Sequence, residues 1–260
     1  MQIVLTCQNT GIIDIPVNYN YYVQSAIFKI LADENSDYAE YLHNIADGSK
    51  TRYKFFTFGS LIGKSHFYNK TLYYEGGIKL EIRSVSNEFL QVLANSILNG
   101  NKLCIGKHCL SIKDVDIRGY TVPDTLLKIE SICLKAPISS SYTVPDTLLK
   151  IRTLTPIVAK KQTEDNHTEY YSPQDVRFIK RIRETFENKY NVFVGQVQHS
   201  SIDILPLNVG KKVVTKYKDT WITAYHGTFE ICGSTECLQF LYDVGLGVKT
   251  SQGFGMFEVI

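Results

Sequence analysis

Apolar and polar residues follow two periodicities along the first half of the chain. Apolar side chains recur every three or four positions in residues 18–35 and 86–100, which predicts two amphipathic helices. Residues 37–44 predict a short helix that ends near His43. Runs rich in β-branched and aromatic residues predict strands at residues 1–9, 53–63, 71–84 and 101–119. This order, β-α-β-β-α-β, is that of the ferredoxin-like motif.

The two longer helices carry signals for their ends and their buried faces. Ser86 is placed to cap the second helix at its N-terminus and Gly100 at its C-terminus. The core-facing residues that the spacing predicts are Tyr22, Ala26, Ile27, Ile30 and Leu31 in the first helix, and Phe89, Leu90, Leu93, Ile97 and Leu98 in the second.

The same order of elements recurs in the second half. A helix is predicted over residues 172–190, with Ser172 and Pro173 at its start, and another after Ser234. The apolar face of the first of these is expected to hold Val176, Ile179, Ile182, Phe186 and Tyr190. Strands are expected at residues 148–161, 192–207, 213–233 and 254–260. The pattern therefore predicts an α+β fold of two tandem ferredoxin-like (RRM-like) domains.

One segment, YTVPDTLLKI, occurs at residues 120–129 and again unchanged at 142–151. Two copies with so short a period do not make a solenoid. A recent duplication and a strand-length insertion both remain open. The second copy continues into the strand expected at 148–161, so we take it as the core copy and place the domains at residues 1–120 and 121–260.

Composition and charge narrow the class of protein only a little. The chain has 260 residues, of which 44% are hydrophobic and 21% charged, as in ordinary folded proteins. Its net charge is +2, so any attraction for phosphate must come from local basic patches. Neither a signal peptide nor a run of roughly 20 apolar residues is evident, so we expect a cytoplasmic protein without a membrane partner.

The cysteines raise the question of a metal site. Cys104 and Cys109, like Cys232 and Cys237, are separated by four residues, and His108 lies beside the first pair. This gap is at the upper edge of structural zinc spacing, and adjacent residues of a strand point to opposite faces. Since several cysteines lie in apolar runs, we expect reduced, buried thiols, with no metal and no cofactor.

A glycine-rich segment, GLGVKTSQGFG at residues 245–255, joins the last predicted helix to the last predicted strand. Glycine permits positive φ and close approach of backbone N–H groups to a ligand, and the lysine, hydroxyl and amide side chains donate to phosphate. A helix followed by a strand is the reverse of the dinucleotide-binding order. The segment therefore suits a polyanion, with a plain flexible connection as the alternative.

The segment GLGVKTSQGFGMFEV also resembles the glycine-rich signature that ends the CRISPR-associated repeat-RNA endoribonucleases of the RAMP superfamily. SAIFKIL, DYAEYLHN and YKFFTFGSLIG are similar to that family's helix, histidine-bearing segment and following strand. The resemblance covers nearly the whole chain and is weakest around the repeated segment. It implies that the glycine-rich segment binds RNA, through Gly245, Gly247, Lys249, Thr250, Ser251, Gln252, Gly253 and Gly255.

The resemblance further implies cleavage of a CRISPR repeat transcript without metal, by attack of a ribose 2′-hydroxyl on the adjacent phosphate. His43 stands where the family has its catalytic histidine, although a cation at the end of a helix would also be favoured by the helix dipole. Lys50 and then Arg52 are the expected stabilisers of the phosphorane, whereas Lys54 is expected to belong to the following strand.

Phe28 departs from the family pattern, because many members carry a tyrosine at this position of the first helix. Phenylalanine has no hydroxyl to orient or polarise a phosphate. Tyr22, nearly two turns earlier, could face the same way but is expected to pack in the core. We therefore expect an active site in which catalysis depends mainly on His43.

Three functions remain open: a metal-independent endoribonuclease, a non-catalytic RNA-binding module, and a structural subunit of a CRISPR ribonucleoprotein. His43 with Lys50 and Arg52 favours the first, and Phe28 favours the second. The expected partner is CRISPR repeat RNA, single-stranded or hairpin; a homodimer and contacts with effector subunits stay open. Further basic residues that could follow an RNA backbone are Arg177, Lys180, Arg181, Arg183, Lys211, Lys212, Lys216 and Lys218.

Overall fold

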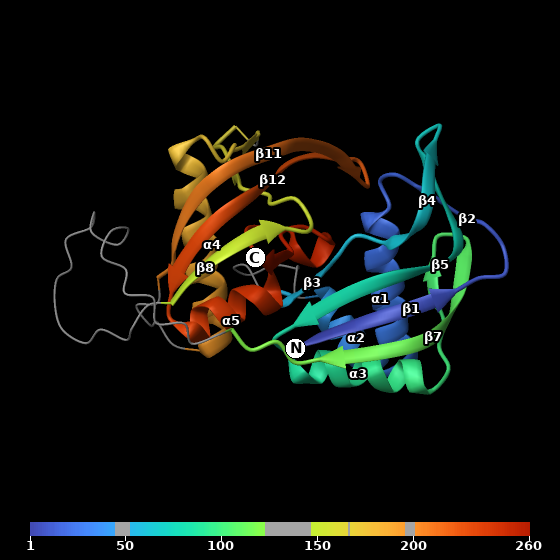
Figure 1. The fold of residues 1–260 in the computed structure, drawn as a ribbon. Helices are drawn as coiled ribbons and strands as arrows, with labels where there is room; N and C mark the ends of the chain where they lie inside the picture. The colour runs from blue at the N-terminus through green and yellow to red at the C-terminus, as the bar shows by residue number, and fades with distance from the viewer. Residues whose placement is uncertain (45–52, 123–146, 166, 196–200) are drawn as a thin grey trace.

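The computed structural model describes residues 1–44, 53–122, 147–165, 167–195 and 201–260. In these residues the chain forms two large antiparallel sheets with helices packed against them, one in each half, and a separate two-stranded sheet (Figure 1). We call the part from β1 (Gln2–Gln8) to β7 (His108–Arg118) the N-terminal half and the part from β8 (Thr147–Thr153) to β13 (Phe257–Val259) the C-terminal half. None of the helices in the described ranges is long and apolar enough to cross a membrane.

The N-terminal half has the ferredoxin-like strand order. Its elements are β1 (Gln2–Gln8), β2 (Ile13–Pro16), α1 (Asn20–Glu34), α2 (Ser36–Asn44), β3 (Phe56–Phe58), β4 (Ile62–Tyr68), β5 (Thr71–Ser84), α3 (Asn87–Leu98), β6 (Leu103–Ile105) and β7 (His108–Arg118). The central strands follow the order β4-β5-β1-β7, all antiparallel. Strands far apart in sequence thus lie side by side, as the βαββαβ pattern requires.

The C-terminal half repeats this order. Its elements are β8 (Thr147–Thr153), β9 (Lys160–Gln162), β10 (Thr168–Tyr170), α4 (Val176–Val194), β11 (Asp203–Tyr217), β12 (Thr220–Gly233), α5 (Thr235–Val244), the short helix η2 (Thr250–Gln252) and β13 (Phe257–Val259). The sheet has the order β11-β12-β8-β13. The tandem ferredoxin-like fold expected from the sequence is therefore confirmed.

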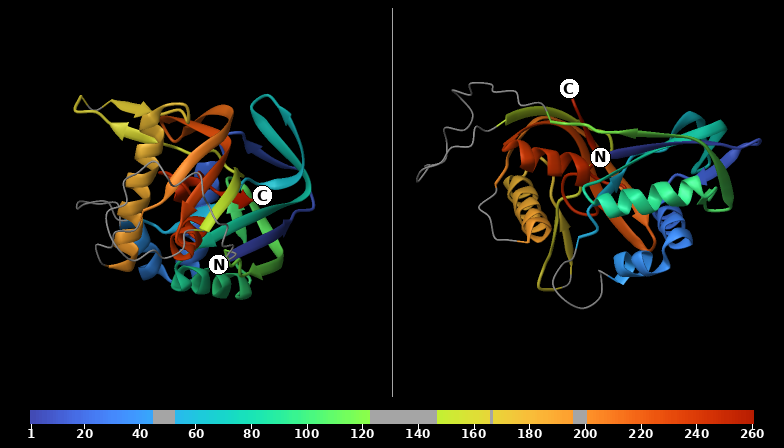
Figure 2. Two further views of the ribbon diagram at one scale, coloured as in Figure 1. Left: turned by 60° about the vertical axis from the view of Figure 1, so that its left-hand side comes forward. Right: turned by 90° about the horizontal axis from the view of Figure 1, so that it is seen from below.

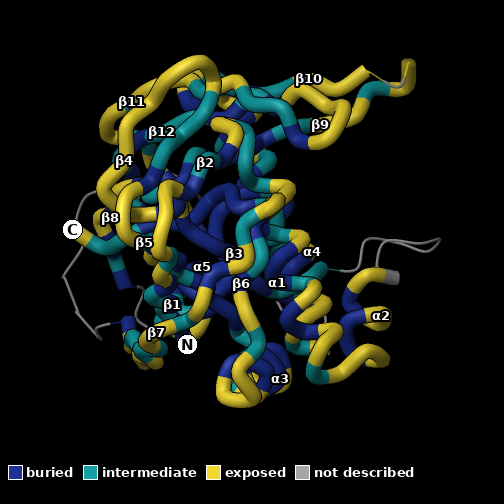
Figure 3. The backbone as a smooth tube through the Cα atoms, turned by 90° about the vertical axis from the view of Figure 1, so that its right-hand side faces the viewer, coloured by how far each residue is buried: buried dark blue, intermediate teal, exposed yellow. Residues whose placement is uncertain are grey.

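Each half has its own core between sheet and helices. In the N-terminal half Phe56 stacks on Phe89, with ring centroids 4.7 Å apart. In the C-terminal half Phe178 of α4 stacks on Phe229 of β12, at 6.1 Å. Seen from below, the helices lie on one side of the two sheets (Figure 2). The small β9–β10 hairpin stands out from this body, and most of its residues are exposed (Figure 3).

Three helix faces differ from their predicted composition. In α3 the predicted core residue Leu98 is 83% exposed. In the first turn of α1, Val23 is buried, whereas Tyr22 is 37% exposed. The prediction of a core Tyr22 was therefore wrong. In α4 Asp175 rather than Ser172 is the N-cap, and its side chain accepts from the Arg177 N–H. Because the helix starts at Val176, the buried stripe begins at Phe178 and leaves Val176 82% exposed.

The ends of other elements also differ from the prediction. α4 continues to Val194 and ends at Gly195, which has a φ of +69°, so residues 192–194 are helical and β11 starts only at Asp203. β2 and the β9–β10 hairpin were not predicted, because strands of three or four residues leave little periodicity to read. Ser86 and Ser234 do cap α3 and α5, as predicted.

The repeated segment is described only in part. Its second copy supplies Thr147–Ile151 to β8, as expected. Of the first copy, Tyr120 stacks on Tyr242 with centroids 4.2 Å apart, and Val122 is buried in the core of the C-terminal half. Thr121 is exposed, and the remaining residues of both copies lie outside the described residues. We keep the division at residues 120 and 121 as a proposal.

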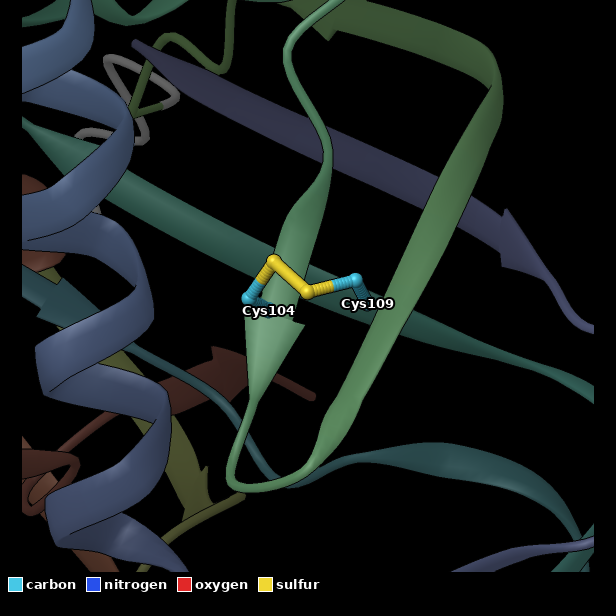
Figure 4. Close-up of a disulfide and its surroundings, with 2 residues drawn as sticks. All are labelled: Cys104 and Cys109. Atoms are coloured by element: carbon cyan, nitrogen blue, oxygen red, sulfur yellow. A yellow bond between two sulfur atoms is a disulfide. The ribbon is translucent and has the colours of Figure 1, made fainter.

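Cys104 and Cys109 form a disulfide across the β6–β7 hairpin (Figure 4). The two residues are directly opposite each other in the register, with Cα atoms 3.9 Å apart. Neither is buried, so the prediction of reduced, buried thiols was wrong for this pair. A tight hairpin turns a four-residue gap into a cross-strand contact, which zinc spacing alone does not reveal. Cys7, Cys232 and Cys237 are buried as predicted, and Cys133 lies outside the described residues.

Arg83 of β5 joins the two halves. Its side chain is almost fully buried, its Nε donates to Glu81 at 2.6 Å and its Nη1 donates to the Phe257 carbonyl oxygen of β13 at 2.7 Å. The guanidinium also lies over the Tyr242 ring of α5, 3.9 Å from its centroid. One buried cation thus contacts a strand and a helix of the other half.

Replacing Arg83 by Met should lower the free energy of unfolding by about 3 kcal/mol, because it leaves the Glu81 carboxylate and the Phe257 carbonyl without their donor. Urea unfolding measures this loss. The control is Arg118→Met, which removes a guanidinium that is 62% exposed and should leave the stability nearly unchanged. Equal stabilities of the two variants would contradict the role of Arg83.

Candidate active site

The glycine-rich segment is held against α1 by two side-chain amides one helical turn apart. Asn20 Nδ2 donates to the Gln252 carbonyl oxygen at 2.7 Å, and Gln24 Nε2 donates to the Ser251 carbonyl oxygen at 2.7 Å. Phe28 follows one turn later on the same face of the helix. α1 therefore seats the loop with its first two turns and presents Phe28 beside it.

The four glycines of this loop are buried, and each has a φ between +75° and +81°. A Cβ at Gly253 would collide with the Phe58 ring, and one at Gly255 would collide with the Leu246 carbonyl. The glycines thus allow the loop to fold tightly against the protein. The side chains between them divide: Thr250 is buried, whereas Lys249, Ser251 and Gln252 line an open cleft.

The tip of the β11–β12 hairpin closes another side of this cleft. The hairpin arches from the C-terminal half toward α1 (Figure 1). Asn18 Oδ1 accepts from Thr215 Oγ1 at 2.8 Å, and the Tyr217 hydroxyl donates to Gln24 Oε1. Gln24 therefore contacts the hairpin through its oxygen and the loop through its nitrogen.

The resulting cleft has a volume of about 640 Å³ and lies between the two halves. Its wall combines one imidazole, several ammonium groups, hydroxyls and amides. The residues lining it are Tyr21, Gln24, Ser25, Phe28, His43, Lys54, Tyr217, Lys218, Thr220, Lys249, Ser251 and Gln252. No carboxylate is among these described lining residues, so the wall suits an anion.

His43 and Lys54 meet at Phe28. His43 is in the last turn of α2, and its ring lies edge-on to Phe28 with centroids 6.1 Å apart. Lys54 Nζ lies 4.6 Å from the centroid of the same phenyl ring. The prediction that Lys54 belongs to a strand was wrong, since β3 begins only at Phe56. Lys54 instead lies in the cleft, where it can act beside His43.

Two of the cleft lysines have ammonium groups that their surroundings disfavour. Burial, and then the charge of Lys218, lower the pKa of Lys54. Burial, and then the charge of Lys160, lower the pKa of Lys249 to about 8. Burial and neighbouring cations both disfavour the charged form, and a bound phosphate would favour it.

The other residues singled out in the sequence are distributed as follows. Lys50 and Arg52 lie outside the described residues. Arg177 pairs with Asp175 and Glu169, Arg181 pairs with Glu184, and Arg183 pairs with Asp203, so these guanidinium groups are partly neutralised. Lys180, Lys211 and Lys212 are exposed, Lys216 lies 4.0 Å from Asp219, and Lys218 lines the cleft.

The sequence left Asn20, Gln24 and Tyr21 unnoticed, although all three help to build the cleft. The polar positions 20 and 24, one turn apart beside buried Val23 and Ile27, were the available signal.

As for a metal, no group of three or more His, Cys, Asp or Glu side chains in the described part of the chain could hold one. His108, weighed above as a zinc ligand, lies 2.8 Å from an Asp14 oxygen.

Replacing Gly253 by Ala should destabilise the protein by about 1–3 kcal/mol, because alanine meets both a positive φ and the Phe58 ring. Urea unfolding measures the change. Gly11→Ala is the matched control, since nothing lies within 4 Å of a Cβ there. If the two substitutions cost the same, the loop is not packed as described.

Comparisons with known proteins agree with this architecture. Residues 14–116 match the family model described as CRISPR-associated protein Cas6, N-terminal, and residues 141–259 match that described as CRISPR associated protein Cas6, C-terminal. The chain is 26% identical to "CRISPR-associated endoribonuclease Cas6 1" of Methanocaldococcus jannaschii, covering 98% of this chain and 91% of the relative. It is 23% identical to "CRISPR-associated endoribonuclease Cas6" of Pyrococcus furiosus, covering 94% and 83%.

Solved structures give the same result. One described as CRISPR associated protein Cas6 superposes with a TM-score of 0.76 at 25% identity, covering 100% of this chain and 99% of the other. Another, described as a RAMP protein binding different RNA substrates, has a TM-score of 0.77 at 22% identity and also covers 100% and 99%. With both halves matched in sequence and the whole chain matched in fold, the protein belongs to the CRISPR-associated Cas6 family.

Proposed function

We propose that this protein is an endoribonuclease that cleaves CRISPR repeat RNA in precursor transcripts to produce crRNA, without a metal ion. The observation that carries the proposal is the cleft in which His43 lies with Lys54, Lys218 and Lys249. The relatives named as endoribonucleases support the activity. The cleft supports the chemistry, because it offers a group that moves protons and a positively charged wall for a phosphodiester.

In the proposed reaction the ribose 2′-oxygen attacks the adjacent phosphorus and the bond to the 5′-oxygen breaks. Neutral His43 takes the proton of the 2′-hydroxyl, since imidazole accepts protons near neutral pH. The Lys54 ammonium, whose pKa burial lowers, donates a proton to the departing 5′-oxygen. The products are a 2′,3′-cyclic phosphate and a 5′-hydroxyl.

The remaining cations and donors stabilise the phosphorane. Lys218 and Lys249 supply charge, and Ser251 and Gln252 supply hydrogen bonds from the loop. The glycines serve by holding these side chains in place. Lys50 and Arg52 remain proposed contributors, because they belong to the segment between α2 and Tyr53. Mg²⁺ is usually held through carboxylates, and none of the described residues that line the cleft carries one.

A non-catalytic RNA-binding module is the second candidate. Phe28 favours it, because the ring between His43 and Lys54 offers no hydroxyl to the phosphate. A homodimer or a place in an effector complex is compatible with either function.

Labelled repeat RNA incubated with the protein in EDTA should be cut at one position and yield a cyclic phosphate. The same RNA with a single 2′-deoxy nucleotide at that position should bind but stay intact, because it lacks the attacking oxygen. Gel analysis of the products checks both. Cleavage of the deoxy substrate, or cleavage only with added divalent metal, would contradict the proposal.

His43→Ala should lower the single-turnover cleavage rate by about 10²–10⁴-fold, the usual contribution of one general base. RNA affinity should change little. His66→Ala is the matched control, because His66 is an exposed histidine of β4 outside the cleft, and its rate should equal that of the wild type. A His43→Ala rate equal to the wild-type rate would favour the non-catalytic module.

The affinity for uncleaved RNA should fall as the pH rises from 7 to 9. The Lys249 ammonium, with a pKa of about 8, is mostly charged at pH 7 and mostly neutral at pH 9, so its attraction for phosphate is present below pH 8 and lost above it. A charge-assisted contact of this kind amounts to roughly a tenfold change in Kd. Lys249→Arg, which keeps its charge, should show a clearly smaller pH dependence in filter binding. Identical pH dependence of both proteins would remove Lys249 from RNA binding.

A further inference from the structure

A second, smaller cavity adjoins the cleft at the glycine-rich loop. Its volume is about 170 Å³, more than ten times the roughly 10–15 Å³ that a single water needs. It is lined by Tyr53, Lys54, Phe55, Lys189, Val244, Val248, Lys249, Thr250 and Ser251. Lys54, Lys249 and Ser251 also line the large cleft, so the two spaces adjoin through these side chains.

Lys189 of α4 is the most unusual of these residues. Only 5% of its surface is exposed, although a lysine is almost never buried without a charged partner. Its Nζ donates to the Gly247 carbonyl oxygen at 2.8 Å and to Thr250 Oγ1 at 3.3 Å, and lies 6.0 Å from the centroid of the Tyr53 ring. Since Thr250 and Tyr53 both line the cavity, the ammonium nitrogen lies at its wall.

Three ammonium groups therefore surround one small space. In the described part of the chain, Lys54, Lys189 and Lys249 form no ion pair with a carboxylate. An ammonium has three donors, and the protein supplies two acceptors to that of Lys189. The hydroxyls of Thr250 and Ser251 add further possible donors.

We propose that this cavity is a phosphate-binding site in which Lys189, Lys249 and Lys54 hold one phosphate group. Where the protein binds RNA as proposed above, that group is a backbone phosphate next to the one that is cut, because the cavity shares Lys54 and Lys249 with the cleft. This second statement rests on the proposed function; the first does not. A free phosphate ion has the same chemistry and is the other source.

The electrostatics of the lysines agree with this assignment. Burial lowers the pKa of Lys189 to about 7, and burial followed by the Lys160 charge lowers that of Lys249 to about 8. A bound phosphate anion would favour the charged form of both. The alternative role of Lys189 is purely structural, in which its two hydrogen bonds only link α4 to the loop. In that case the protein would have no affinity for phosphate at this cavity.

Calorimetric titration of the whole protein with inorganic phosphate, at constant ionic strength, tests the site without RNA. One phosphate should bind per chain, and Lys189→Met should weaken it at least tenfold. Lys249→Met should also weaken it, and it covers the case in which Lys189→Met does not fold. Lys102→Met, which removes an exposed lysine after α3, is the control and should bind as the wild type does. Absence of phosphate binding by the wild type, or wild-type affinity in both cavity variants, would overturn the site.

A second titration identifies the source of the phosphate. The substrates are a series of repeat RNAs that all carry a 2′-deoxy nucleotide at the cut. In each of them a different flanking phosphate is replaced by a neutral methylphosphonate. At one position the neutral group should weaken binding to the wild type and leave binding to Lys189→Met unchanged. If no position behaves so, the RNA phosphate is excluded and free phosphate is the ligand. A protein that binds phosphate but does not cut RNA would refute only the proposed function, and one that cuts RNA but binds no phosphate would refute only this site.

Discussion

The candidate site depends on the docking of the glycine-rich loop against α1. The side-chain amides of Asn20 and Gln24 donate to loop carbonyls that the short helix η2 leaves without partners. Gln24 also accepts a hydrogen bond from the Tyr217 hydroxyl at the tip of the hairpin. Unpaired carbonyls at such an interface would be costly, so these contacts fix how the loop lies on α1. Without them, Lys249 and Ser251 would not lie in the same cleft as His43.

Backbone conformation and packing account for the glycines of the loop. Positive φ values and close contacts with Phe58 and Leu246 account for Gly253 and Gly255 without any ligand. Their role in RNA binding, as we propose it, is indirect: they bring Lys249, Ser251 and Gln252 to the cleft and Thr250 to the buried lysine. The loop thus contributes side chains to both the cleft and the smaller cavity, and ammonium groups line each of them.

Much of the fold was predictable, because it rests on local periodicity and capping. Ser86 and Ser234 marked two helix starts, and the apolar stripes of α1 and α3 placed much of the core of the N-terminal half. The site was less predictable, because contacts between residues far apart in sequence create it. Lys54 could be assigned to the cleft only once α1 had brought Phe28 beside it, and the cross-strand contact of Cys104 with Cys109 required the hairpin register. His43 lines the cleft from the last turn of α2, and its catalytic role stays a prediction, as do the roles of Lys50 and Arg52.

The central proposal is that the RNA phosphate that is cut lies in the cleft between α1 and the glycine-rich loop. It is tested most directly by photocrosslinking the His43→Ala protein to repeat RNA that carries a 2′-deoxy nucleotide and an azidophenacyl phosphorothioate at the cut position. The account predicts crosslinked peptides from both Tyr21–Phe28 and Lys249–Gln252. Crosslinks confined to one of these segments, or found only outside the cleft, would contradict it.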